Sequence, residues 1–153
     1  MSNSLALRST LLAFVLAGSL GLPVALTAQQ TMQASGPRIH SGGPTFGVDG
    51  PSFVAPADHV FRAVFEINQG DSDGTAMNQQ LGTVARFLNL HARHGVADDH
   101  VHAAAVVHGG GFSALMSDEA YGARFDGKTN PSRELVEELL ANGVQLVLCG
   151  QTA

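Results

Sequence analysis

Hydrophobic and polar residues alternate with two different periods along the chain, and each change of period predicts a new element. Residues 59–68, HVFRAVFEIN, combine alternation with β-branched and aromatic side chains, which predicts a strand. The polar run NQGDSDG follows as a turn. Residues 75–95 then carry apolar side chains at helical spacing and end in a glycine that favours helix termination. These apolar positions are Met77, Leu81, Val84 and Leu88.

The following segments repeat this order of strand and helix. Residues 100–111 contain the unbroken apolar run Ala103–Val107, which is typical of a strand buried on both faces. The stretch FSALMSDEAYGARF is expected to form one or two short helical turns. The final apolar run, VQLVLC at residues 144–149, predicts a third strand.

A second long helix is predicted for residues 130–143, NPSRELVEELLANG. Asn130 is a favourable N-cap residue, Pro131 suits the first helical position, and Gly143 follows the last turn. The alternation of strands and helices therefore predicts a parallel α/β sheet with right-handed crossovers. We expect a small three-layer domain. Three strands are few for such a sheet, so the domain is expected to be incomplete at its C-terminus or completed by a partner.

The N-terminus has the pattern of a secretory signal peptide, residues 1–28. Arg8 precedes the apolar stretch Leu11 to Leu22, and Leu26 and Ala28 stand at the −3 and −1 positions. The stretch is shorter than the roughly 18 to 20 apolar residues needed to span a bilayer. The pattern predicts cleavage after Ala28 and a periplasmic or secreted protein, with no membrane attachment afterwards.

Residues 29–58 are rich in glycine, proline and serine and show no hydrophobic period. They predict a flexible leader, with Phe46, Val48 and Phe53 as its contacts with the domain. The ordered domain is then expected at residues 59–153. The whole chain has a formal charge of −5, and loss of Arg8 with the signal peptide makes it more negative. This balance argues against nucleic acid as a partner.

Candidate chemistry gathers where the strands end, because loops at the carboxyl edge of a parallel sheet form its usual ligand crevice. Three groups of residues follow the three predicted strands there. They are Asn68 and Gln69, then His108 with Gly109, Gly110 and Gly111, and finally Cys149 with Gly150 and Gln151.

Cys149 is the single cysteine, so the chain cannot form an internal disulfide. A cysteine is nucleophilic as thiolate, which His108 and the backbone N–H groups of Gly109–Gly111 could favour. Alternatively, Cys149 is a small buried hydrophobic residue at the end of a core strand. His108 could equally be a strand-end histidine bound to a backbone carbonyl.

Other motifs point to no further chemistry. The stretch HGGGF is similar to the oxyanion loop of esterases, but the G-x-S-x-G nucleophile motif is absent, as are the phosphate-loop and dinucleotide patterns. His91 and His94 could share a metal on one helix face. Histidines in the last turn are also favourable beside the helix C-terminal dipole, and no third ligand is nearby, so we expect no metal site.

The stretch VVHGGGFSALMSDEAYGARFDGKTNPSRELVEELLANGVQLVLCGQTA resembles the DsrE/DsrF-like family of sulfur-relay proteins. The shared features are a strand ending in HG, a short helical segment, an N-P helix start and a strand ending in C-G-Q. The resemblance extends over residues 59–153. Members of the family usually continue beyond C-G-Q with a further helix and one or two strands, which again implies an incomplete C-terminus.

The resemblance implies a homo- or hetero-oligomer, commonly a trimer or hexamer, with the cysteine near a subunit boundary. It also implies that Cys149 carries sulfane sulfur as a persulfide between donor and acceptor proteins, without a metal or organic cofactor. His108 matches a recurrent family position. A non-catalytic oligomeric binding or assembly module with a structural Cys149 is the alternative, and a histidine-based metal binder is a third hypothesis.

Overall fold

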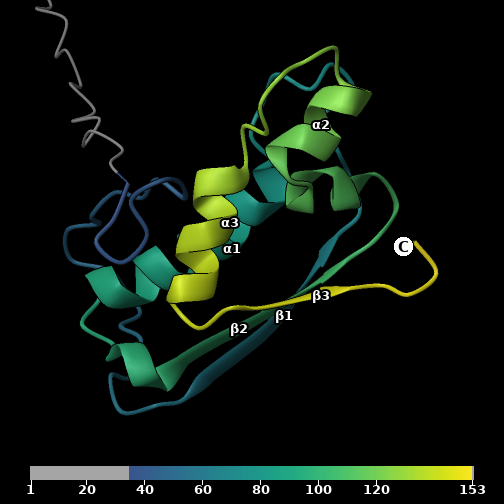
Figure 1. Ribbon diagram of the computed structural model, residues 1–153. Coiled ribbons are helices and arrows are strands. Elements are labelled where there is room, and N and C mark those ends of the chain that lie inside the picture. Colours follow the sequence, from purple (N-terminus) through teal and green to yellow (C-terminus); the bar gives the residue numbers. More distant parts are fainter. Residues whose placement is uncertain (1–34, 153) are drawn as a thin grey trace, which may run out of the picture.

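The computed structural model describes residues 35–152, which form three strands with helices between them (Figure 1). The predicted signal peptide, residues 1–28, lies outside the described residues. In chain order the elements are β1 (Phe61–Ile67), α1 (Gln79–Arg93), the 3-10 helix η1 (Asp98–His100), β2 (Val101–Val107), the 3-10 helix η2 (Gly109–Leu115), α2 (Asp118–Arg124), α3 (Arg133–Ala141) and β3 (Gln145–Leu148). The predicted order of strands and helices is confirmed. None of the described helices is long and apolar enough to cross a membrane.

The sheet is parallel throughout and its strands lie in the order β1, β2, β3. Both connections therefore advance in the same direction, and right-handed crossovers put α1 and α3 on the same side of the sheet. Figure 1 shows these helices together above the sheet. The small parallel α/β domain is thus as expected. Within residues 35–152, however, it has two layers rather than the three that the sequence predicted.

Side chains of β2 alternate between the covered and the uncovered face of the sheet. Val101, Ala105 and Val107 are buried under the helices. Val106 between them is 37% exposed. The expectation that Ala103–Val107 is buried on both faces is therefore wrong for this part of the chain. An apolar run alone does not distinguish a strand covered twice from one covered once.

Helix α1 begins at Gln79 because Asn78 caps it, with Asn78 Oδ1 accepting a hydrogen bond from the N–H of Leu81. It ends beside Gly95, whose φ of +78° terminates the helix as predicted. Its buried side chains face the sheet and α3, and they are Leu81, Val84, Ala85, Leu88 and Asn89. Met77 precedes the helix instead of lying in its first turn.

Helix α3 begins at Arg133, so the prediction that Asn130 is its N-cap residue is wrong by two positions. Asn130 Oδ1 accepts a hydrogen bond from the N–H of Ser132 at 2.9 Å, within the turn that leads into the helix. Its Nδ2 donates to the carbonyls of Ala114 and Met116. Buried Asn130 therefore ties the start of α3 to η2 and the loop after it. Gly143 follows the helix with a φ of +79°, as expected.

Residues 38–45, which we call the strap, pack against α1 and α3 instead of forming part of a flexible leader. Ile39 is 0% exposed and lies within the hydrophobic core. The side chains of Phe46, Val48 and Phe53, which were expected to contact the domain, are all more than half exposed. Of these, Phe53 lines a pocket with Leu90 and His91 of α1. The domain therefore begins before residue 59. A single buried residue in a glycine-rich stretch gives no periodic signal, which explains why the sequence predicted a flexible leader here.

Asn89 of α1 anchors the strap from inside the core. Its Oδ1 accepts hydrogen bonds from the N–H groups of Arg38 and Ile39, at 3.0 and 2.7 Å. Its Nδ2 donates to the carbonyls of Ile39, Gly42 and Gly43. A Cβ at Gly43 would stand 2.3 Å from the backbone nitrogen of Arg86, so only glycine allows this close approach.

Glu138 of α3 holds the same strap from the outside. Its carboxylate accepts hydrogen bonds from the N–H groups of His40 and Ser41 and from the Ser41 hydroxyl, and it lies 3.2 Å from His40 Nδ1. Partial burial raises the pKa of Glu138, but the bonds from Ser41 and His40 outweigh it and lower the pKa to about 2. The carboxylate is therefore charged near neutral pH, where it accepts these hydrogen bonds.

Candidate functional site at the carboxyl edge of the sheet

Backbone hydrogen bonds bring the three strand ends together at one edge of the sheet. The N–H of His108 donates to the carbonyl of Ile67 at 2.9 Å, and the N–H of Cys149 donates to the carbonyl of Val107 at 2.8 Å. The N–H of Gly109 reaches the Thr152 hydroxyl at 3.2 Å. The two backbone bonds continue the parallel pairing one residue beyond β2 and β3, so the loops expected at this edge are neighbours.

His108 and Cys149 occupy adjacent positions on neighbouring strands. The register pairs Val107 with Leu148, and the next residues along β2 and β3 are His108 and Cys149. Parallel strands lie about 4.8 Å apart, and side chains alternate between the two faces of a sheet. His108 and Cys149 therefore project from the same side, the one that α1 and α3 leave uncovered.

The imidazole of His108 is held by a residue that sequence reasoning missed, Glu66 of β1. His108 Nε2 lies 2.9 Å from Glu66 Oε1, and both side chains are partly exposed. This carboxylate takes the place of the backbone carbonyl that the sequence suggested as a partner. Glu66 is the one acidic residue in β1 and lies on the same face as Arg62 and Val64. Its position near the end of the predicted strand was the sequence signal that could have marked it as a site residue.

The Cys149 thiol is neither buried nor hydrogen-bonded within the described part of the chain. Its side chain is partly accessible, and its sulfur makes no hydrogen bond within residues 35–152, with His108 or any other side chain. A thiol in this position can meet a small reagent from solvent. The interpretation of Cys149 as a fully buried core residue therefore does not describe the structure.

The glycine loop after β2 serves packing more than anion binding. Gly109 has a φ of +52°, and a Cβ at Gly111 would stand 2.3 Å from the carbonyl oxygen of Ile67. The N–H of Gly109 binds Thr152, and the N–H of Gly111 binds the carbonyl of His108. Two of the three N–H groups that were expected to favour a thiolate are thus already engaged.

The loop after β1 is fixed by amide side chains. Gln80 Oε1 accepts hydrogen bonds from the N–H groups of Asn68 and Gln69, each at 2.9 Å, and Gln80 Nε2 donates to Asn68 Oδ1. Asn78 Nδ2 donates to the Gln69 carbonyl at 2.7 Å. The predicted binding residue Asn68 therefore has a structural role in shaping the loop.

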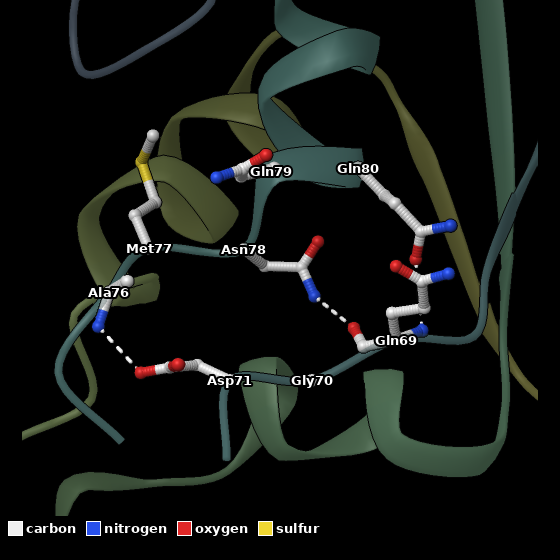
Figure 2. Close-up of a pocket in the computed structure, with 8 residues that line it drawn as sticks. All are labelled: Gln69, Gly70, Asp71, Ala76, Met77, Asn78, Gln79 and Gln80. Carbon is white, nitrogen blue, oxygen red and sulfur yellow. Dashed lines mark hydrogen bonds between the residues drawn. The ribbon is translucent and has the colours of Figure 1, made fainter. Parts of the chain in front are cut away.

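A polar pocket of about 260 Å³ lies between this loop and the start of α1 (Figure 2). Gln69, Asn78 and Gln79 contribute to its lining. So does Asp71, whose carboxylate accepts hydrogen bonds from the N–H groups of Ala76 and Thr75. The hydrogen bond from Ala76 has the largest effect and that from Thr75 the next. Together they lower the pKa of Asp71 below its usual range in spite of slight desolvation. The resulting negative charge disfavours anions in this pocket.

The remaining predicted residues lie in the turn after β3. The N–H of Thr152 donates to the carbonyl of Cys149 at 2.9 Å, which closes a turn through Gly150 and Gln151. Both are exposed, and the Gln151 side chain makes no hydrogen bond to other described residues. Gly150 has open space around it, so this turn leaves access to the sulfur.

The histidines form no recognisable metal site. No group of three or more histidine, cysteine or acidic side chains with suitable geometry occurs between residues 35 and 152. His91 Nδ1 lies 2.7 Å from the carbonyl oxygen of Phe87, and its ring packs between Phe61 and Phe87. His91 is therefore occupied by packing and a local hydrogen bond.

The candidate site thus consists of a partly exposed thiol, an adjacent imidazole and a carboxylate bound to that imidazole. None of these three residues lines the polar pocket at the start of α1. Such a set can donate and accept a proton beside a sulfur nucleophile. Comparison with known protein families, curated proteins and solved structures gives no match for this chain.

Proposed function

We propose that the protein is an exported sulfur carrier, similar to the DsrE/DsrF-like relay proteins, in which Cys149 holds sulfane sulfur as a persulfide. The observation that carries the proposal is the position of the Cys149 thiol, which is partly accessible, makes no hydrogen bond within residues 35–152, and lies next to His108 at the carboxyl edge of a parallel sheet. Residues 59–153 supply the motif resemblance, and the signal-like N-terminus supplies the expectation of export to the periplasm.

Glu66 and His108 act together in the proposed mechanism. Glu66 occupies Nε2 of His108, which leaves Nδ1 as the ring nitrogen that accepts the proton of the Cys149 thiol. A carboxylate bound to one imidazole nitrogen fixes the tautomer and supports a positive charge on the ring. For this step the imidazole must contact the sulfur, and His108 and Cys149 follow directly after the paired residues Val107 and Leu148.

Sulfur transfer then proceeds by thiol exchange. With thiosulfate as donor, the Cys149 thiolate attacks the outer sulfane sulfur, the sulfur–sulfur bond of the donor breaks, and sulfite leaves with the bonding electron pair. The product is a Cys149 persulfide. An acceptor thiolate subsequently attacks the outer sulfur of the persulfide and releases Cys149 as a thiolate. No metal or organic cofactor takes part.

A second function, a non-catalytic oligomeric binding module, is favoured by a different observation. The sheet face opposite α1 and α3 exposes Val64 by 75% and Val147 by 50%. Large apolar side chains in a group on one face are typical of an interaction surface. In this second function Cys149 has no chemical role.

Intact-protein mass spectrometry after incubation with thiosulfate or polysulfide separates the two functions. The carrier is expected to gain the mass of one sulfur atom, which a reducing agent removes and which Cys149→Ser does not acquire. Ser113→Ala, which removes a hydroxyl bonded to the Gly110 carbonyl in the same loop, is the matched control and should still be modified. Absence of an adduct with either donor would leave the binding module as the function.

A further inference from the structure

The uncovered face of the sheet, which we call the open face, is arranged in three rows by the strand register. The first row holds Arg62 and His102. The middle row holds Val64, Ala104 and Gln145. The third row holds Glu66, Val106 and Val147. Parallel sheets normally have both faces covered, so a face that exposes three valines in the described part of the chain is a candidate interaction surface.

The shape of the open face differs between its two ends. A hollow of about 410 Å³ lies at the amino-terminal end, where Ala104 is small and Gly143 has no side chain. At the other end Val106 and Val147 project from neighbouring strands and are 37% and 50% exposed. One end of the face therefore has the shape that fits the other end.

The charges of the open face have the same complementarity. Arg62 lies at the hollow end and makes no hydrogen bond or ion pair with the other described residues. Glu66 lies at the projecting end, where one of its oxygens binds His108 and the other has no partner in the described part of the chain. Val64 stands midway between these two opposite charges on β1.

We propose that a second copy of this chain covers the open face, with the two sheets face to face and their strands antiparallel. The two-fold axis runs across the strands at the level of Val64 and Ala104. It sets each strand against the same strand of the copy, so that Arg62 meets Glu66 of the copy. Val106 and Val147 of each copy then face His102 and Gly143 of the other, which both line the hollow.

The alternative two-fold arrangement, with the axis along the strands, keeps all strands parallel. It leaves Arg62 and Glu66 at opposite ends of the interface, and it sets the projecting valines of one copy against those of the other. Only the antiparallel arrangement satisfies both the charges and the shape, as isologous contacts require.

The size of the face determines the strength of the dimer. Three strands about 4.8 Å apart present a narrow surface, which places the contact at the small end of specific interfaces. We therefore expect a dimer in exchange with monomer, with a dissociation constant on the order of 10 µM. This inference does not rest on the reactivity of Cys149.

Sedimentation velocity over a range of concentrations tests the dimer, using protein from expression of the full chain whose N-terminus is identified by mass. Val64→Lys is expected to weaken dimerisation at least about tenfold, since it buries a charge at the centre of the interface. Leu140→Lys, at an apolar position on α3 that is 52% exposed, is the control and should leave the dimer unchanged.

Charge reversal tests the proposed arrangement of the copies. Arg62→Glu and Glu66→Arg should each weaken the dimer about tenfold, because like charges then meet twice across the two-fold axis. The double variant should recover the dissociation constant to within about threefold, since it restores opposite charges. Circular dichroism establishes that each variant is folded.

Cys149→Ser must retain the dimer, which excludes a disulfide between copies and keeps this test separate from that of sulfur transfer. A wild-type protein that stays monomeric at about 300 µM, well above the expected dissociation constant, would overturn the inference. So would a dimer that persists in Val64→Lys, or charge-reversed variants whose combination fails to recover association.

Discussion

The two faces of the sheet carry similar side chains and have different surroundings. On the covered face, Ile67, Val101 and Val107 are buried in the hydrophobic core. On the open face, Val64, Val106 and Val147 have the same size and hydrophobicity and remain exposed. The difference comes from the strand order, because two right-handed crossovers in one direction place both helices on one side. Topology, and not residue type, therefore decides which valines form the core.

The difference also separates the residues of the core from those of the candidate site. The covered face, together with the strap, contains the buried hydrophobic cluster and the buried polar anchor Asn89. The open-face side carries Glu66, His108 and Cys149 at its carboxyl edge. Substitutions beneath the helices should change the free energy of unfolding, and those on the open face should change association or reactivity.

The largest effect is expected for Ile39→Ala in the strap. Removing a fully buried isoleucine should lower the free energy of unfolding by about 3 kcal/mol, through lost transfer energy and a cavity. Phe53→Ala is the control, since this larger side chain is 78% exposed and should cost less than about 0.5 kcal/mol. Urea unfolding of both variants provides the comparison. Equal effects would mean that the strap is not part of the core.

A smaller effect is expected within β2, where neighbouring valines lie on opposite faces. Val107→Ala should lower the free energy of unfolding by about 2 kcal/mol because Val107 is fully buried. Val106→Ala should change it by less than about 0.5 kcal/mol in dilute protein. Urea unfolding of the two variants thus compares the free-energy cost of the same valine-to-alanine change on each face of the sheet. A larger loss for Val106 would show that the open face is covered in the monomer.

The smallest stability effect concerns the bonds between Glu138 and the strap, and it depends on pH. The pKa of Glu138 is about 2 in the folded protein, below its ordinary value of 4.5. Its contribution, about 1 to 2 kcal/mol after allowance for partial exposure, is therefore present above pH 4.5 and lost as the pH falls toward 2.

Glu138→Gln tests this contribution by urea unfolding at about pH 6 and about pH 3. The variant should be less stable than wild type at the higher pH, and the difference should shrink at the lower pH. Glu137→Gln, an exposed neighbour on α3 that pairs with Arg133, serves as the control. An unchanged difference at both values of pH would contradict the role of the Glu138 charge.

The sequence predicted the elements well because their signals are local. Alternation in residues 59–68, helical spacing before Gly95 and the glycine after α3 all depend on residues close in the chain. The third layer was predicted from the apolar run in β2, yet coverage of a face depends on crossover direction, which no local pattern contains. The strap was missed because Ile39 stands in a stretch without a hydrophobic period, and its partner Asn89 is 50 residues away in the chain.

The candidate site was predictable in position and less so in detail. The rule that strand ends converge located His108 and Cys149 at one edge. It could not show that Asn68 is taken up by Gln80, or that Gly109 and Gly111 have engaged N–H groups. Glu66 was missed because its contact with His108 joins strands that are distant in sequence and depends on their register.

The central claim, that Cys149 accepts sulfur with help from Glu66 and His108, is tested most directly by the rate of adduct formation. Intact mass is followed over time after mixing with polysulfide, in wild type, Cys149→Ser, Glu66→Gln and Arg62→Gln. We predict one removable sulfur atom in wild type, none in Cys149→Ser, and a rate about tenfold lower in Glu66→Gln, since orientation of a general base is lost. Arg62→Gln on the same strand face should react at the wild-type rate. No adduct in wild type, or an adduct that persists in Cys149→Ser, would contradict the account.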